Sequence, residues 1–85
     1  MLAAMDSSIE RTVYVRLLNE GTDVYRPTNA VFKEPDIYFL KSPAGYDPED
    51  EHWEFLPGSS VKCVERVLAD GCVLVASELA HERER

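Results

Sequence analysis

The sequence is short of positive charge, of glycine and of long apolar runs. It has 9 Lys and Arg against 16 Asp and Glu, a net charge of −7 at pH 7, whereas general nucleic-acid binders need positive charge facing the phosphates. With only 4 glycines and no glycine-rich loop, it has no Walker or Rossmann phosphate turn. No apolar run approaches the roughly 18 residues that a membrane span needs. The sequence therefore predicts neither a nucleic-acid partner nor a membrane partner.

Patterns for catalysis and for metal binding are equally sparse. The serines after Pro57-Gly58 lack the Gly-x-Ser-x-Gly context of a nucleophile. His52 lies among carboxylates, a setting that suits a salt-bridging side chain better than a general base. The histidines and cysteines have no metal-ligand spacing, and the acids do not follow the EF-hand pattern. We therefore expect a protein that is not an enzyme and that has no metal and no cofactor.

The sequence has two cysteines, Cys63 and Cys72, on either side of a turn typical of a hairpin tip. A two-residue loop at that tip would place Cys63 opposite Glu78, and a three-residue loop would place it opposite Ser77. In neither register do the two sulfurs face one another, so we expect two free thiols. Because the N-terminal residues also lack the basic and apolar regions of a signal peptide, we expect a cytoplasmic location.

Five runs have the composition of β-strands, namely residues 12–19, 28–33, 37–40, 61–68 and 72–77. Between the third and fourth lies the longest irregular stretch, residues 41–60. Within it Asp47 is suited to cap a helical turn and Pro48 fits the first helical position, so we expect one short helical turn over residues 48–51.

Short strands at this spacing predict an all-β fold, a five-stranded antiparallel barrel. We expect a single domain over residues 9–79, between a flexible N-terminal tail at 1–8 and a charged C-terminal tail at 80–85. The alternation of apolar residues predicts a core that includes Val13, Val15, Leu17, Phe32, Phe39, Phe55, Val61 and Val67.

Three segments resemble the opening strands of Tudor-type SH3-like barrels: Leu17-Leu18-Asn19-Glu20-Gly21, the run from Val24 to Val31, and Ile37-Tyr38-Phe39-Leu40. The stretch Ala44-Gly45-Tyr46-Asp47 is similar to the start of an SH3 domain. Residues 13–72 also resemble a family of small uncharacterised bacterial proteins with the segment Tyr-Asp-Pro-Glu-Asp-Glu…Trp-Glu-Phe…Pro-Gly. The resemblance implies an SH3-like barrel and brings no function with it.

The strongest candidate site is the acidic loop, residues 47–54, with five acids and no Lys or Arg. Such a loop attracts a basic protein partner and speeds its association. Flanking aromatic rings would add a groove for an extended or basic ligand. The candidate partner-binding residues are Tyr25, Tyr46, Asp47, Glu49, Asp50, Glu51 and Trp53. The alternatives are a loop that only confers solubility and, for Trp53, partial burial in the core.

A second candidate surface follows from the turn at Pro35-Asp36. With that turn, Phe32 pairs with Phe39 and Val31 pairs with Leu40, and the two pairs lie on opposite faces. We expect Phe32, Ile37 and Phe39 to point inward. The outer face would then carry an interface patch for a homodimer or another partner, made of Val31, Tyr38 and Leu40. The alternative is that a terminal segment covers this patch.

These features favour a small protein-interaction module whose acidic loop contacts a basic or extended partner. Two other functions stay open. A small acidic chain would also suit an immunity or antitoxin protein that neutralises a basic toxin surface. A nucleic-acid-binding barrel is disfavoured by the acidity and by the lack of a basic patch, because Arg16, Arg26, Lys33 and Lys41 are scattered.

Overall fold

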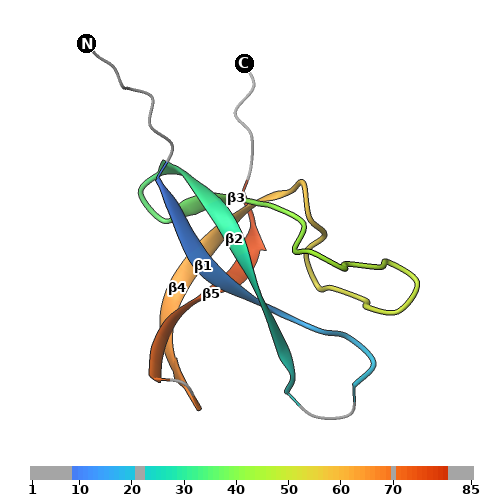
Figure 1. The fold of residues 1–85 in the computed structure, drawn as a ribbon. Helices are drawn as coiled ribbons and strands as arrows, with labels where there is room; N and C mark the ends of the chain where they lie inside the picture. Colours follow the sequence, from blue (N-terminus) through green and yellow to red (C-terminus); the bar gives the residue numbers. More distant parts are fainter. Residues whose placement is uncertain (1–8, 21–22, 70, 81–85) are drawn as a thin grey trace.

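The computed structural model describes residues 9–20, 23–69 and 71–80, which form an all-β barrel with no helix (Figure 1). Its strands follow one another around a closed barrel in chain order. They are β1 (Glu10–Arg16), β2 (Tyr25–Glu34), β3 (Ile37–Leu40), β4 (Ser60–Leu68) and β5 (Gly71–Leu79). The all-β prediction and the five-stranded barrel are confirmed. The tail predicted at 1–8, and all but Ala80 of the tail predicted at 80–85, lie outside the described residues. Within those residues no helix has the length and apolarity to cross a membrane.

The barrel is not wholly antiparallel, as the sequence had led us to expect. Each strand pairs antiparallel with the next, but β1 and β5 pair in parallel, with Val13 opposite Leu74 and Tyr14 opposite Val75. The reason is the odd number of strands. When each of five consecutive strands reverses direction, the first and the last run the same way, so the pair that closes the barrel is parallel.

The core lies inside the barrel, and β1 supplies two of its fully buried side chains, Val13 and Val15. The predictions of Val13, Val15 and Val61 as core residues are confirmed, and Leu17 and Phe55 pack against the core while partly buried. The buried cluster is made of Val13, Val15, Ala30, Tyr38, Leu40, Trp53, Val61, Cys63 and Ala76.

The pairing of β2 with β3 corrects the predicted orientation of β3. A bulge at Lys33 inserts one residue, so that Phe32 faces Tyr38 rather than Phe39. The inserted residue shifts the pairing of β2 with β3 by one position. Because side chains alternate between faces, this shift places Tyr38 and Leu40 on the inner face instead of the outer one. Tyr38 and Leu40 are therefore buried, at 6% and 0% exposure.

The predicted interface patch of Val31, Tyr38 and Leu40 is wrong, because two of its members are core residues and only Val31 lies on the outer face. Phe39 is opposite Val31 on that outer face, half-buried, with the Nζ of Lys33 5.6 Å from its ring centroid. Phe32 stays 38% exposed, although its ring packs edge-on against Tyr38 at 5.7 Å.

The hairpin of β4 and β5 explains why a further predicted core residue, Val67, is 80% exposed. The strands on either side pair with only part of this hairpin. β3 pairs with β4 at 60–62, and β1 pairs with β5 at 74–75. Val67 lies beyond both, so no strand packs over it. The register places Cys63 opposite Ala76 and Cys72 opposite Val67. It differs from both predicted registers, yet both cysteines are free, as predicted.

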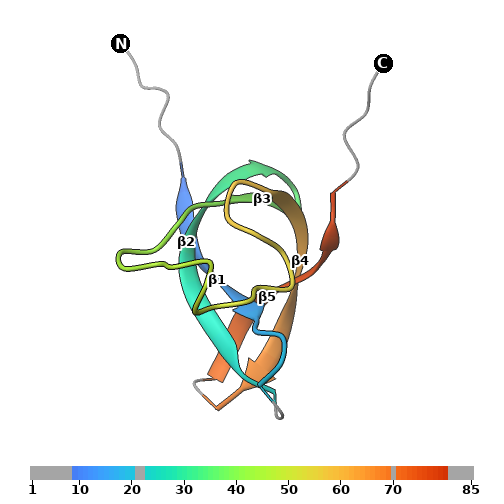
Figure 2. The same cartoon turned by 90° about the vertical axis from the view of Figure 1, so that its right-hand side faces the viewer.

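The long connection from Lys41 to Ser59 folds across one end of the barrel (Figure 2). The helical turn predicted for residues 48–51 is not a helix. The backbone makes a single tight turn there, in which the carbonyl of Asp47 accepts hydrogen bonds from the amides of Asp50 and Glu51 at 2.9 and 3.0 Å. Because the turn is not continued by further bonds, no helix follows it.

Candidate functional site

The acidic loop is attached to the barrel through its C-terminal end. The amide of Leu18 donates to the carbonyl of His52 at 2.6 Å, and the amide of Glu54 donates to the carbonyl of Arg16 at 2.9 Å. Leu17 and Trp53 form an isolated antiparallel bridge between these two bonds. The segment at 52–54 therefore acts as a short extra strand on the edge of the chain that continues β1.

Trp53 holds this end of the loop in the barrel. Its side chain is 3% exposed and belongs to the buried cluster. The ring of Tyr46 packs edge-on against it, with ring centroids 5.1 Å apart. The indole Nε1 donates a hydrogen bond to Oε1 of Glu51 at 3.0 Å. A buried indole with a satisfied N–H contributes large apolar contact and no polar penalty.

Glu51 joins the loop to β2 as well. The same carboxylate oxygen lies 3.1 Å from Nε of Arg26, and the two side chains are only 20% and 33% exposed. The N–H of Arg26 Nε is buried and does not point at an acceptor with hydrogen-bond geometry, so the contact is an ion pair rather than a directed bond. Glu51 thus has a structural role that the sequence did not indicate.

The other acids of the turn are displayed to solvent. Asp47, Glu49 and Asp50 are exposed. Asp47 also closes the turn, because its Oδ1 accepts a hydrogen bond from the amide of Glu49 at 2.9 Å. The turn is thereby held in shape while three carboxylates face outward, an arrangement that offers concentrated negative charge to a basic group.

The predicted aromatic groove beside the acidic loop does not form. Trp53 is a core residue, and half-buried Tyr46 packs on it rather than standing beside it as a second wall. Tyr25 begins β2 opposite Arg16 and lines a different hollow. The alternative that Trp53 is buried is the one that the structure supports.

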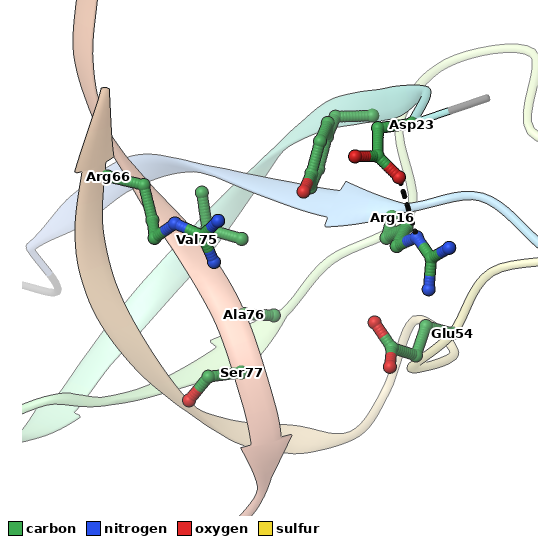
Figure 3. Close-up of a pocket in the computed structure, with 8 residues that line it drawn as sticks. Arg16, Asp23, Glu54, Arg66, Val75, Ala76 and Ser77 are labelled. Atoms are coloured by element: carbon green, nitrogen blue, oxygen red, sulfur yellow. Dashed lines mark ion pairs between the residues drawn. The ribbon is translucent and has the colours of Figure 1, made fainter. Parts of the chain in front are cut away.

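That hollow is the seam pocket, an opening of about 300 Å³ between β1 and β5. Figure 3 shows Arg16, Asp23 and Glu54 on one side and Arg66, Val75, Ala76 and Ser77 on the other. Arg16 Nε lies 3.6 Å from Asp23 Oδ1. The sequence did not indicate this pocket, because Arg16, Glu54 and Arg66 are far apart along the chain and only the seam brings them together. It is lined by Arg16, Asp23, Tyr25, Glu54, Arg66, Val75, Ala76 and Ser77.

The thiols and acids show no arrangement of metal ligands in the part of the chain that the structure describes, where no group of three or more His, Cys, Asp or Glu side chains gathers. Burial, with the charge of Asp36 adding to it, raises the pKa of the Cys63 thiol to about 11. Since the thiolate is the nucleophilic form, we expect the buried Cys63 to react slowly.

Comparison of the chain with protein-family models, curated proteins and solved structures finds no match. Its function is therefore inferred from the barrel, the acidic loop and the seam pocket alone.

Proposed function

We propose that this chain is a non-catalytic protein-binding module that receives a basic segment of a partner protein on its acidic loop. The proposal rests on the different environments of the acidic side chains in the loop. Glu51 is tied to Trp53 and Arg26, whereas Asp47, Glu49 and Asp50 are exposed on the turn that this anchor holds. A pre-shaped loop loses less conformational freedom on binding than a flexible one.

Charge supports the same proposal. The chain has a net charge of −7, so its field attracts basic partners and repels other copies of itself over distances of about 8 Å at physiological salt. Electrostatic attraction of this kind mainly raises the association rate and the salt dependence of binding. A basic partner is therefore expected to bind less tightly as salt increases.

We further infer that the barrel is of the SH3-like type and that the protein works in the cytoplasm. The first inference is supported by the closed order of five short strands and by the resemblance of the opening segments. The second is supported by the two free cysteines, since oxidising compartments favour disulfides.

The test compares what the protein captures from a lysate before and after the loop loses its charge. The loop variant carries Asp47→Asn, Glu49→Gln and Asp50→Asn, which keep the oxygen at residue 47 that closes the turn. The control variant carries Glu20→Gln, Glu34→Gln and Glu65→Gln, the same change of three charges at exposed positions elsewhere.

We expect quantitative mass spectrometry to show a basic protein that is captured by the wild type and by the control variant, is lost with the loop variant, and is released by salt. Equal capture by all three proteins, or equal loss with both variants, would contradict a role for the acidic loop as the contact site.

A further inference from the structure

The seam between β1 and β5 is the shortest strand pairing in the described barrel. The two strands pair only at Val13–Leu74 and Tyr14–Val75. If the parallel register continued, Arg16 would pair with Ser77; instead these two residues line the seam pocket. Past Val75, no described strand pairs with the β1 side of β5, so its residues 76–79 form a free edge there.

Two features hold the seam open. The first is a β-bulge at Ser77, because Cys63 pairs with Ala76 whereas Lys62 pairs with Glu78. Bulges bend a strand, and the Ser77 hydroxyl stabilises this one by donating to the Lys62 carbonyl at 3.1 Å. The second feature is the segment at 52–54, which takes the edge of the chain at 16–18 that β5 would otherwise occupy.

We propose that an extended segment of a partner protein adds as a strand to the free edge of β5 and lays its side chains in the seam pocket. Strand addition to an open sheet edge supplies affinity through main-chain hydrogen bonds, and adjacent pockets supply specificity. This inference rests on the proposed function as a protein-binding module, and it names a second contact surface and the sequence of the segment that fits it.

The charges of the pocket define that segment. The side chains of Arg66 and Glu54 have no ion pair or hydrogen bond among the described residues. Arg66 reaches from β4 toward Val75, while Glu54 lies on the opposite side of the pocket, next to Arg16 (Figure 3). An acidic side chain therefore suits the Arg66 end and a basic side chain suits the Glu54 end.

The positions of Arg66 and Glu54 also constrain the face of the segment that carries the two charges. Arg66 is paired with Val73 across the hairpin and its side chain reaches toward Val75 (Figure 3), whereas the amide of Glu54 is bonded to the carbonyl of Arg16 on the other side of the pocket. Both side chains line the same pocket, and because side chains alternate between the two faces of a strand, one face of the segment has to supply both charges. The segment thus carries an acidic and a basic residue on the same face of its strand.

A neighbouring hollow extends the seam pocket. A second hollow shares Asp23, Tyr25 and Arg66 with it and continues to Tyr14 and Leu68. Beyond the acidic residue the segment therefore meets tyrosine rings and an aliphatic side chain, which favour an apolar residue. A second copy of this chain is a poor occupant, because two copies of net charge −7 repel one another.

The experiment selects peptides from a phage-displayed library of random 12-residue sequences on the immobilised full-length protein. We expect enrichment of peptides with an acidic and a basic residue at a constant separation that places both on one face of a strand. The variant Arg66→Glu should select a basic residue where the wild type selects an acidic one, and should bind the wild-type peptide about tenfold more weakly, the size of one lost charge pair. The control Glu65→Lys, on the neighbouring residue of the same strand and the other face, should select the wild-type sequence.

A second measurement checks the main chain. Binding of the selected peptide should slow amide hydrogen exchange within residues 76–79. A selected sequence that does not change with Arg66→Glu, or protection that falls elsewhere, would overturn the inference. Selection of no peptide, or a protein that sediments as a dimer through this edge, would overturn it too. If peptide binding is lost only when Asp47, Glu49 and Asp50 are replaced, the proposal of strand addition is wrong, whereas the proposed function of the acidic loop is retained.

Discussion

The carboxylate of Glu51 accepts a hydrogen bond from the indole of Trp53, two residues further along the chain. The same oxygen faces Arg26 of β2, so one carboxylate ties an indole, a strand and a loop together. This contact makes the acidic loop part of the barrel rather than an appendage, and it separates one structural acid from three that are free to meet a partner.

Trp53 is expected to be a main determinant of stability. Replacing it by alanine should lower the free energy of unfolding by about 3–5 kcal/mol, because a large buried side chain is lost and a cavity remains. The control Leu56→Ala, in the same connection but 56% exposed, should cost no more than about 0.5 kcal/mol. Urea unfolding followed by circular dichroism measures both. A Trp53→Ala protein as stable as the control would place the indole outside the core.

The orientation of β3 gives a second contrast. Leu40→Ala should lower the free energy of unfolding by about 2–5 kcal/mol, since Leu40 is fully buried. Val67→Ala should change it by no more than about 0.5 kcal/mol, since Val67 is 80% exposed. The opposite ranking in urea unfolding would restore the orientation expected from the sequence and contradict the bulge at Lys33.

The two thiols should react at very different rates. Cys72 is exposed and Cys63 is buried, so the folded protein should give one rapidly reacting thiol with an aromatic disulfide reagent, and the denatured protein should give two. Cys72→Ala should abolish the rapid reaction and Cys63→Ala should leave it intact. Two rapid thiols in the folded protein would show that the barrel interior is open.

Stability should fall in alkaline solution partly because of Cys63. Folding raises the pKa of its thiol from 9.0 to about 11, chiefly through burial, so between these values the folded state holds more protons than the unfolded state. The resulting contribution to stability is complete below pH 9 and is lost as the pH rises through 11. Urea midpoints measured from pH 8 to 11 should decline less steeply for Cys63→Ala than for the wild type. An unchanged slope in Cys63→Ala, or an equal change in the control Cys72→Ala, would be inconsistent with this origin.

The sequence predicts the strands well because their composition is local. The runs around Val13 and Val61 alternate clearly, and both residues are in the core. Prediction from the sequence fails where a single inserted residue determines which face of a strand points into the barrel. The bulge at Lys33 depends on how β3 pairs with its neighbours, and no local pattern marks it. The parallel seam could have been foreseen, because five consecutively antiparallel strands cannot close antiparallel.

The candidate site was predicted only in part. The composition of the acidic loop is visible in the sequence, and Asp47, Glu49 and Asp50 are exposed as expected. The role of Glu51 is not visible there, because it depends on Arg26, which is distant along the chain. The seam pocket was missed for the same reason, since Glu54 and Arg66 are brought together only by tertiary structure.

The most direct test of this account is the melting temperature of Glu51→Ala compared with that of the loop variant Asp47→Asn, Glu49→Gln, Asp50→Asn. Glu51→Ala leaves a buried indole N–H without its acceptor, a loss of about 1–3 kcal/mol, and each 1 kcal/mol lowers the midpoint of a domain this small by about 4–8 °C. The loop variant should melt within about 2 °C of the wild type, because exposed charges contribute little to stability. Two results would contradict the account: a loop variant that melts far below the wild type, or a Glu51→Ala protein with the melting temperature of the wild type. Either would show that Glu51 does not differ from the three exposed acids in its contribution to stability.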